Sequence, residues 1–197
     1  MEYVVDNPII ADLGSAFRLS DPRQVGYLSF ALSYALGGEN PVGYHLFNVF
    51  VHIANSLMIF ALARSLFRIL SRFQDPAPVH LHAAFLAAVL FLVHPVQTQA
   101  ISYITQRFTS LATFFYLLAV WSYLAARTGF ETGWPPRKAA SLYALSIVAT
   151  VLAMRTKEIA FTIPAVLVLF EALTLRGSRA GARRFLFVVP FAAASLL

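Results

Sequence analysis

Long apolar segments alternate with short polar linkers along this chain, and arginine or lysine residues stand at the ends of the apolar segments. Only 12% of the 197 residues are charged, whereas a soluble domain carries about 25%. The pattern predicts an all-α fold, a polytopic transmembrane helical bundle. About six membrane segments are expected: Tyr44–Leu66, Leu81–Val93, Phe108–Ala126, Ala139–Met154, Ile159–Leu175 and Phe185–Leu197.

The basic residues favour one side of this bundle. Ten of the 15 follow the first, third and fifth apolar segments: Arg64, Arg68, Arg72, Arg127, Arg137, Lys138, Arg176, Arg179, Arg183 and Arg184. The positive-inside rule places these ten in the cytoplasm. The net charge of +6 therefore reflects membrane topology, and no nucleic-acid partner is expected. The N-terminal segment and the 94–107 and 155–158 linkers are then exoplasmic. We expect a multi-pass protein of a bacterial inner membrane, or of the endoplasmic reticulum in a eukaryote.

Two regions are expected. Residues 1–43 are predicted to form an exoplasmic loop with an amphipathic interfacial helix from Gln24 to Leu36, which is too short to span a bilayer. Residues 44–197 are predicted to form the transmembrane bundle. The start of the chain lacks the features of a signal peptide, and its end is still apolar. We therefore expect a truncated chain with an incomplete bundle and a helix missing upstream.

Three basic residues of the predicted exoplasmic linkers run against the orientation rule, namely Arg107, Arg155 and Lys157. Arginine can bind phosphate through two parallel hydrogen bonds, and lysine binds it as a point charge. The linkers therefore predict a site for the phosphate of a lipid-linked sugar. The alternative is that these residues contact lipid headgroups or pair with Glu158 and the N-terminal acids.

A polar stripe follows one face of the first apolar segment. Its members are His45, Asn48, His52 and Asn55, which fall within an arc of about 80° on a helix. Such a face must lie against protein and not against lipid. The stripe predicts hydrogen bonds that lock the helices together, or alternatively a histidine in a substrate cavity.

A base-catalysed or metal-dependent transfer needs a carboxylate near the phosphate. Asp6, in the turn Asp6-Asn7-Pro8, is the candidate catalytic residue, and a solvated acidic loop is the alternative. The chain has no cysteine, and His45 and His52 lie two turns apart without a nearby carboxylate, so no metal ligands are assigned. A divalent cation is kept as a candidate cofactor.

Several of these motifs together resemble a known family. They are Ser29–Gly38, Asn40–Val49, His52–Leu57, His94–Ala100 with Gln106-Arg107, and Lys157–Pro164. The combination is similar to the N-terminal membrane part of the transmembrane-and-tetratricopeptide-repeat protein O-mannosyltransferases and their bacterial relatives. The resemblance covers most of residues 5–175.

The resemblance implies a GT-C-type glycosyltransferase that transfers a sugar from a polyprenyl-phosphate donor to a protein or glycan acceptor on the exoplasmic side. Pocket roles are then expected for His94, Gln97, Gln99 and Glu158. The family is expected to carry an acidic pair in its first exoplasmic loop. This chain has no such pair, so the main catalytic carboxylates are expected upstream, and the chain alone is expected to be largely inactive.

Two other functions are open. A non-catalytic membrane scaffold, or an anchor for a repeat domain, would use the polar stripe for helix association. A transporter of lipid-linked saccharides would need polar groups through the full depth of the bundle, and outside the first apolar segment the spans have few of them.

Overall fold

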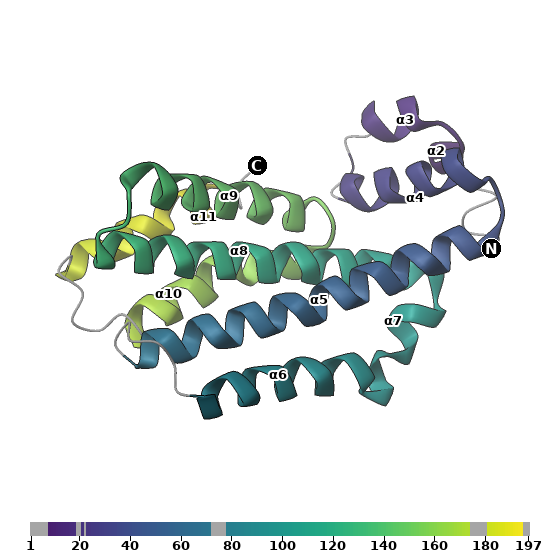
Figure 1. Cartoon of the computed structure of the whole chain (residues 1–197). Coiled ribbons are helices and arrows are strands. Elements are labelled where there is room, and N and C mark those ends of the chain that lie inside the picture. Colours follow the sequence, from purple (N-terminus) through teal and green to yellow (C-terminus); the bar gives the residue numbers. More distant parts are fainter. Residues whose placement is uncertain (1–7, 19–20, 22, 72–77, 174–180, 195–197) are drawn as a thin grey trace.

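The computed structural model describes residues 8–18, 21, 23–71, 78–173 and 181–194, and this part of the chain is helical without strands (Figure 1). Three of its helical stretches are long and apolar enough to cross a membrane. These are α5 (Pro41–Leu70), the stretch Ile104–Thr132 that contains α8 (Arg107–Thr132), and α9 (Pro136–Met154). The predicted all-α polytopic class is confirmed.

A fourth span is formed only if two bent helices are counted together. The helix α6 (Pro78–Val93) is followed at an angle of 49° by the stretch Pro95–Ser102, which includes η1 (Pro95–Gln97) and α7 (Thr98–Ser102). Proline has no N–H for the helical ladder and disfavours a helical residue before it. The helix therefore breaks at His94.

The last two expected segments form shorter elements. The fifth contains η3 (Glu158–Thr162) and α10 (Ile163–Leu173), and the sixth contains η4 (Gly181–Val188) and α11 (Val189–Ala194). Pro164 and Pro190 each stand second in their α-helix, where the missing N–H removes no intrahelical bond. Each expected segment is consequently divided into a 3₁₀ turn and a short helix.

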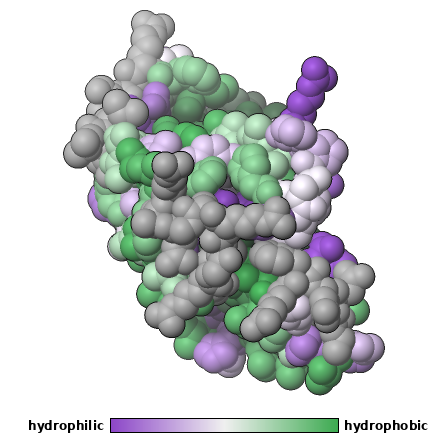
Figure 2. Space-filling model, turned by 90° about the vertical axis from the view of Figure 1, so that its left-hand side faces the viewer, coloured by the Kyte–Doolittle hydropathy of each residue, from purple (hydrophilic) through white to green (hydrophobic). Residues whose placement is uncertain are grey.

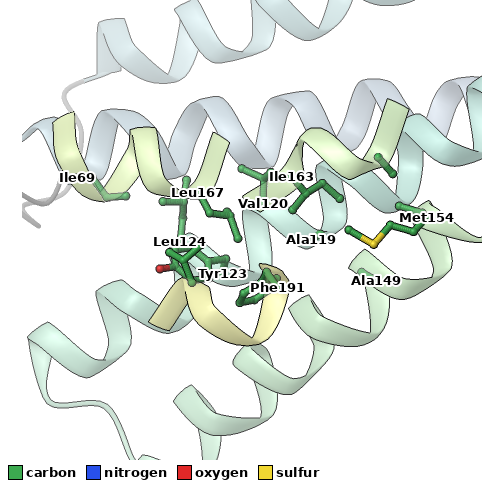
Figure 3. Close-up of a cluster of buried hydrophobic side chains, with 13 residues drawn as sticks. Ile69, Ala119, Val120, Tyr123, Leu124, Ala149, Met154, Ile163, Leu167 and Phe191 are labelled. Atoms are coloured by element: carbon green, nitrogen blue, oxygen red, sulfur yellow. The ribbon is translucent and has the colours of Figure 1, made fainter. Parts of the chain in front are cut away.

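The main core lies where α10 and α11 cover the pair α8 and α9 (Figure 3). Its buried members are Ile69, Ala119, Val120, Tyr123, Leu124, Ala149, Ala153, Met154, Ala160, Ile163, Leu167, Val188 and Phe191. The small alanines allow the backbones of α8 and α9 to approach closely. A hydrogen bond of 2.8 Å from Ser146 Oγ to the Ala119 carbonyl joins the same two helices.

A buried ion pair ties α8 to α10 within this core. The Nε of Arg127 lies 2.6 Å from Glu171 Oε1, and both side chains are at most 1% exposed. The hydroxyl of Tyr123 donates to the same carboxylate at 2.7 Å. The sequence had placed Arg127 among the cytoplasmic basic residues, but the structure shows that it is neutralised inside the bundle.

A second, smaller core holds the N-terminal helices α2 (Pro8–Ala11), α3 (Leu13–Arg18) and α4 (Gln24–Gly37) against the bundle. It buries Ile10, Phe30, Tyr44 and Phe108. The expected helix from residue 24 is confirmed, although it packs on the beginnings of α5 and α8. Contact is so close that a Cβ added to Gly26 would lie 2.2 Å from the Phe108 ring.

The polar linkers meet at one end of the bundle. At that end α5 and α8 begin, and α4 and α7 lie there in Figure 1. The N–H of Val25 donates to the Arg155 carbonyl at 3.0 Å, which joins α4 to the 155–158 linker. The N-terminal helices and both linkers are therefore on the same side, as the sequence predicted. The opposite end faces the viewer in Figure 2.

Candidate functional site

A cavity of about 260 Å³ opens between α5, α6, the residues around α7, and α8. We call it the linker cavity. It is lined by His52, Asn55, Phe91, Val96, Gln97, Gln99, Ala100, Gln106, Thr109, Ser110 and Thr113. Most of these side chains carry an amide, a hydroxyl or an imidazole, and none of the described lining residues carries a carboxylate. The linker cavity is thus a neutral, hydrogen-bonding pocket in an otherwise apolar bundle.

The polar stripe of α5 faces this region. The Nδ1 of His45 lies 3.3 Å from the Ile101 carbonyl, and the amide of Asn48 donates to the Tyr103 carbonyl at 3.3 Å. The Nε2 of His52 lies 3.0 Å from the Leu92 carbonyl. These carbonyls stand at the ends of short helices, where the intrahelical donors are missing. The stripe supplies replacement donors, which apolar surroundings require.

His52 and Asn55 retain unused acceptors at the linker cavity. A carbonyl oxygen only accepts, so the Nε2 of His52 carries the proton and a neutral ring keeps Nδ1 as an acceptor. Asn55 donates to the Ser110 carbonyl at 2.9 Å. Its Oδ1 is buried and has no hydrogen-bond partner within the described residues. A buried carboxamide oxygen without a partner is costly, and here it belongs to a residue of the cavity wall.

Arg107 lies behind the stripe and is fully buried. Its Nε donates to Asn48 Oδ1 at 3.1 Å, and its Nη1 donates to Ser33 Oγ at 2.8 Å and to the Ser29 carbonyl at 3.0 Å. Its Nη2 donates to the Tyr44 carbonyl at 3.0 Å. Four of the five guanidinium N–H groups are thus directed to protein acceptors. Arg107 fastens α8 to α4 and α5.

Aromatic rings surround this buried charge. The Arg107 guanidinium carbon lies 4.4 Å from the centre of the Phe30 ring and 4.4 Å from that of the Phe47 ring. Such cation–π contacts stabilise a cation that has lost its water. Together with the hydrogen bonds they explain how an arginine is accommodated where no carboxylate pairs with it among the described residues.

Lys157 reaches the rim of the linker cavity. Its Nζ donates to Thr109 Oγ1 at 2.7 Å, and Thr109 in turn donates to Gln106 Oε1 at 3.0 Å. Thr109 and Gln106 both line the cavity. Within the described part of the chain Lys157 makes no ion pair. Lys157 is itself not part of the cavity wall, but its ammonium group bonds a residue of that wall.

Comparisons with known proteins show which proteins this chain is similar to. The mouse (Mus musculus) protein O-mannosyl-transferase TMTC4 is 32% identical over 158 residues, which are 78% of this chain and 21% of that protein. The Drosophila melanogaster protein O-mannosyl-transferase Tmtc1 is 34% identical over 140 residues, 71% of this chain and 14% of the relative. Drosophila Tmtc2 is 32% identical over 152 residues, 77% of this chain and 15% of the relative.

The chain belongs to the protein O-mannosyl-transferase family. It spans about a fifth or less of the length of these relatives. No family model matches the chain, and no solved structure matches it.

The structure of this chain separates the predicted pocket residues. Gln97 and Gln99 line the linker cavity. His94 does not, because its Nδ1 accepts from the Val96 N–H at 3.2 Å and caps η1. Glu158 also lies outside the cavity wall and forms an ion pair of 2.8 Å with Arg23.

The Arg23–Glu158 pair has electrostatic consequences outside the spans. The hydrogen bonds and charge of Glu158 raise the pKa of Arg23 above its ordinary value. A hydrogen bond from its own backbone, followed by those from Arg23, lowers the pKa of Glu158. Both side chains are about half exposed, 47% and 54%, so the pair contributes little to stability. The pair engages Glu158, one of the carboxylates that the sequence placed near the predicted cationic cluster.

The three basic residues of the predicted phosphate site also lie in different surroundings. Arg107 points into protein, Lys157 reaches the linker cavity, and Arg155 is half-buried with its carbonyl bonded to Val25. The Arg155 guanidinium has no hydrogen bond or ion pair within the described residues. Asp6 lies outside the described residues. The described part of the chain has no group of three residues arranged to hold a metal ion.

Three hydroxyl-bearing lining residues were missed by the sequence analysis, namely Thr109, Ser110 and Thr113. Together with Gln106, which ends η2 just before α8, they follow a spacing of three and four residues along one face. That spacing is the same signal that identified the stripe on α5. It was masked because Gln106 was assigned to the linker and the hydroxyl residues were counted within an apolar segment.

Proposed function

We propose that this chain supplies the donor site of a GT-C-type glycosyltransferase, which transfers a sugar from a polyprenyl-phosphate donor to a protein or glycan acceptor on the exoplasmic side. The observation that carries the proposal is the linker cavity, a neutral hydrogen-bonding pocket with the Lys157 ammonium at its rim. The names of the relatives suggest mannose as the sugar.

The wall of the linker cavity suits a sugar. Sugar hydroxyls donate and accept hydrogen bonds, and amides and hydroxyls do the same without adding charge. Asn55 Oδ1 and His52 Nδ1 are acceptors that a sugar hydroxyl would satisfy. A site built on such acceptors rejects ligands that leave them unpaired.

The rim of the cavity suits the donor phosphate. Lys157 has three N–H donors, and Thr109 takes one of them, which leaves two for phosphate oxygens. Arg155, two residues earlier, is the second candidate for this contact. Arg107 would act indirectly, because it holds Asn48 and thereby the stripe that shapes the cavity wall.

The catalytic carboxylate is expected from outside the linker cavity, since none of its described lining residues carries one. Asp6 or an acidic residue of the first exoplasmic loop would serve as the base, with a divalent cation as the candidate cofactor. A catalytic carboxylate outside the linker cavity is consistent with a chain that covers about a fifth of the length of TMTC4. The donor site and the base would then belong to different parts of the whole protein.

The proposed location follows from the charges. Lys157, Arg155 and the linker cavity lie at the end where α5 and α8 begin, whereas Arg64, Arg68 and Lys138 lie at the other end. The positive-inside rule then makes the linker cavity exoplasmic, in a bacterial inner membrane or in the endoplasmic reticulum.

A scaffold function is the second candidate. The stripe favours it, since three of its four side chains form hydrogen bonds to backbone carbonyls. Those carbonyls belong to Leu92 at the end of α6 and to Ile101 and Tyr103 after it. Those hydrogen bonds would stabilise the bundle in a non-catalytic protein as well. The unused acceptor of Asn55 favours the donor site instead.

Donor binding tests the proposal directly. The purified chain in lipid nanodiscs would be titrated with a short-chain polyprenyl-phosphate mannose, and the dissociation constant measured by calorimetry. Lys157→Gln is expected to weaken binding about tenfold, the effect of losing one charge-assisted hydrogen bond.

Arg137→Gln is the matched control, because it removes one positive charge from an exposed residue at the opposite end of the molecule. Its affinity for the donor is expected to equal that of the wild type. Equal affinities for Lys157→Gln and Arg137→Gln would remove Lys157 from the site. Absence of saturable binding in the wild type would favour the scaffold.

A further inference from the structure

Chemistry fixes the direction of the two hydrogen bonds that join Lys157, Thr109 and Gln106. The Nζ of Lys157 lies 2.7 Å from Thr109 Oγ1, which lies 3.0 Å from Gln106 Oε1. A lysine ammonium group only donates, so the Thr109 hydroxyl accepts from it. The one proton of this hydroxyl then points to Gln106, where the accepting atom must be the carboxamide oxygen. We call these three side chains the rim relay.

The rim relay leaves the amide nitrogen of Gln106 available. Gln106 lines the linker cavity, and within the described part of the chain its Nε2 makes no hydrogen bond. Both N–H groups of this nitrogen therefore remain for a ligand, as do two of the three N–H groups on the Lys157 ammonium. A neutral donor and a charged donor are thus tied to the same hydroxyl at the rim of the cavity.

Lys157 is held at both ends. Its backbone N–H donates to the Ala153 carbonyl at 3.0 Å, and its carbonyl accepts from the Ala160 N–H at 3.1 Å. Thr109 binds the ammonium group at the other end of the side chain. A lysine side chain that is already ordered loses less conformational entropy when it binds a ligand. The rim relay is therefore arranged before a ligand binds.

The surroundings of the rim relay favour an anion. None of the described residues that line the linker cavity is acidic. Glu158, which follows Lys157 in the chain, forms an ion pair of 2.8 Å with Arg23. Thr109 stands in the first turn of α8, and the N-terminal end of a helix carries a partial positive charge. Lysine is a common ligand of phosphate, as a point charge.

We propose that Gln106 is a second ligand of the donor phosphate, and that Thr109 is a positioning residue that directs Gln106 and Lys157 toward it. Lys157 would contact one phosphate oxygen and Gln106 Nε2 another, and hydrogen bonds to an ionised acceptor are about twice as strong as neutral ones. The inference rests on the proposed donor site. It adds to that site one ligand and one residue that acts through its neighbours.

Two ligands that differ only in the phosphate test the rim relay. The chain in phosphatidylcholine nanodiscs would be titrated by calorimetry with a short-chain polyprenyl-phosphate mannose and with the corresponding prenyl mannoside, which lacks the phosphate. The measured quantity is the ratio of the two dissociation constants. We expect the wild type to prefer the ligand with the phosphate by at least about tenfold. A general collapse of the cavity would weaken both ligands and leave the ratio unchanged.

Gln106→Met removes the Nε2 donor, and Thr109→Val removes the hydroxyl at nearly constant volume. Each is expected to lower the preference for the phosphate by about three- to tenfold. Thr109→Ser keeps the hydroxyl and should restore the wild-type ratio. Thr132→Val is the matched control, because it removes a hydroxyl of α8 that donates only to the Thr128 carbonyl, at 2.8 Å. An unchanged ratio in Gln106→Met or in Thr109→Val would overturn the proposal.

The rim relay and the donor site can be judged separately. Equal binding of the two ligands by the wild type would keep the sugar site and overturn the phosphate role of the rim relay. Absence of saturable binding of both ligands would remove the donor site, and the rim relay with it.

Two other sources of phosphate serve as competitors, namely inorganic phosphate and phosphatidylglycerol in the nanodisc. If each displaces the donor only at concentrations far above that of the donor, the proposal stands. Displacement by either at a concentration similar to that of the donor would assign the rim relay to that anion and overturn the proposal.

Discussion

The buried guanidinium of Arg107 joins three helices, so its replacement by methionine is expected to destabilise the end of the bundle that carries the linker cavity. Methionine keeps the apolar contact with Phe30 and Phe47 but cannot donate a hydrogen bond. The Ser33 hydroxyl already donates to the Ser29 carbonyl at 3.2 Å, so that carbonyl keeps a partner.

The main loss falls on one acceptor. Asn48 Oδ1 would lose the N–H group that lies 3.1 Å away, whereas the Tyr44 carbonyl, 3.0 Å from Nη2, would keep its helical bond within α5. A buried polar group left without its partner costs about 1–3 kcal/mol. We therefore expect Arg107→Met to lower the free energy of unfolding by about 1–3 kcal/mol, which corresponds to a fall of roughly 2–12 °C in Tm.

Thermal unfolding in detergent, followed by tryptophan fluorescence, measures this effect. Arg155→Met is the control, because the Arg155 guanidinium bonds no described residue, and it should change stability by less than about 0.5 kcal/mol. Equal stabilities of Arg107→Met and the wild type would refute the buried role. If Arg107→Met then abolished donor binding without changing Tm, Arg107 would be a ligand of the phosphate after all.

Two further results are expected from the same assay. Gly26→Ala places a Cβ 2.2 Å from the Phe108 ring and should lower the free energy of unfolding by about 1–3 kcal/mol. Gly37→Ala is the control, because no atom lies within 4 Å of its added Cβ, and it should leave Tm nearly unchanged. Equal effects of the two substitutions would refute the close packing of α4 on α8. Because the pKa of Glu158 is lowered in the folded protein, its pair with Arg23 stabilises the fold above the ordinary value of 4.5 and is lost as pH falls through the lowered pKa. Tm values of Glu158→Gln and the wild type, measured against pH, should differ by the equivalent of less than about 1 kcal/mol near neutrality and converge in acid; a difference that grows in acid would contradict this sign.

Local signals in the sequence were sufficient to predict the helices and to predict that the polar stripe of α5 faces protein. The helix that begins at Gln24, the end of the second apolar segment at Val93 and the protein-facing side of His52 and Asn55 are all found where the sequence predicted them. Each depends on neighbouring residues only, such as a proline without an N–H or polar side chains at helical spacing.

The partners of the charged residues could not be predicted in this way. Arg107 reaches acceptors 59 to 78 residues away in the chain, and Arg127 reaches a carboxylate 44 residues away. Whether an arginine at a helix end faces lipid phosphate or the interior depends on which helices cross there. Spacing alone gives no information on that crossing, and for this reason the cationic cluster was predicted as one site.

The position of the bound donor is the most direct test of the account. A polyprenyl-phosphate mannose with a photoreactive group on its sugar would be irradiated with the chain in nanodiscs, and the modified residues would be mapped by mass spectrometry. The account predicts labelling of the residues between 96 and 113 that line the linker cavity, and less labelling in Lys157→Gln. Labelling confined to the opposite end, or spread evenly over the lipid-facing helices, would contradict it.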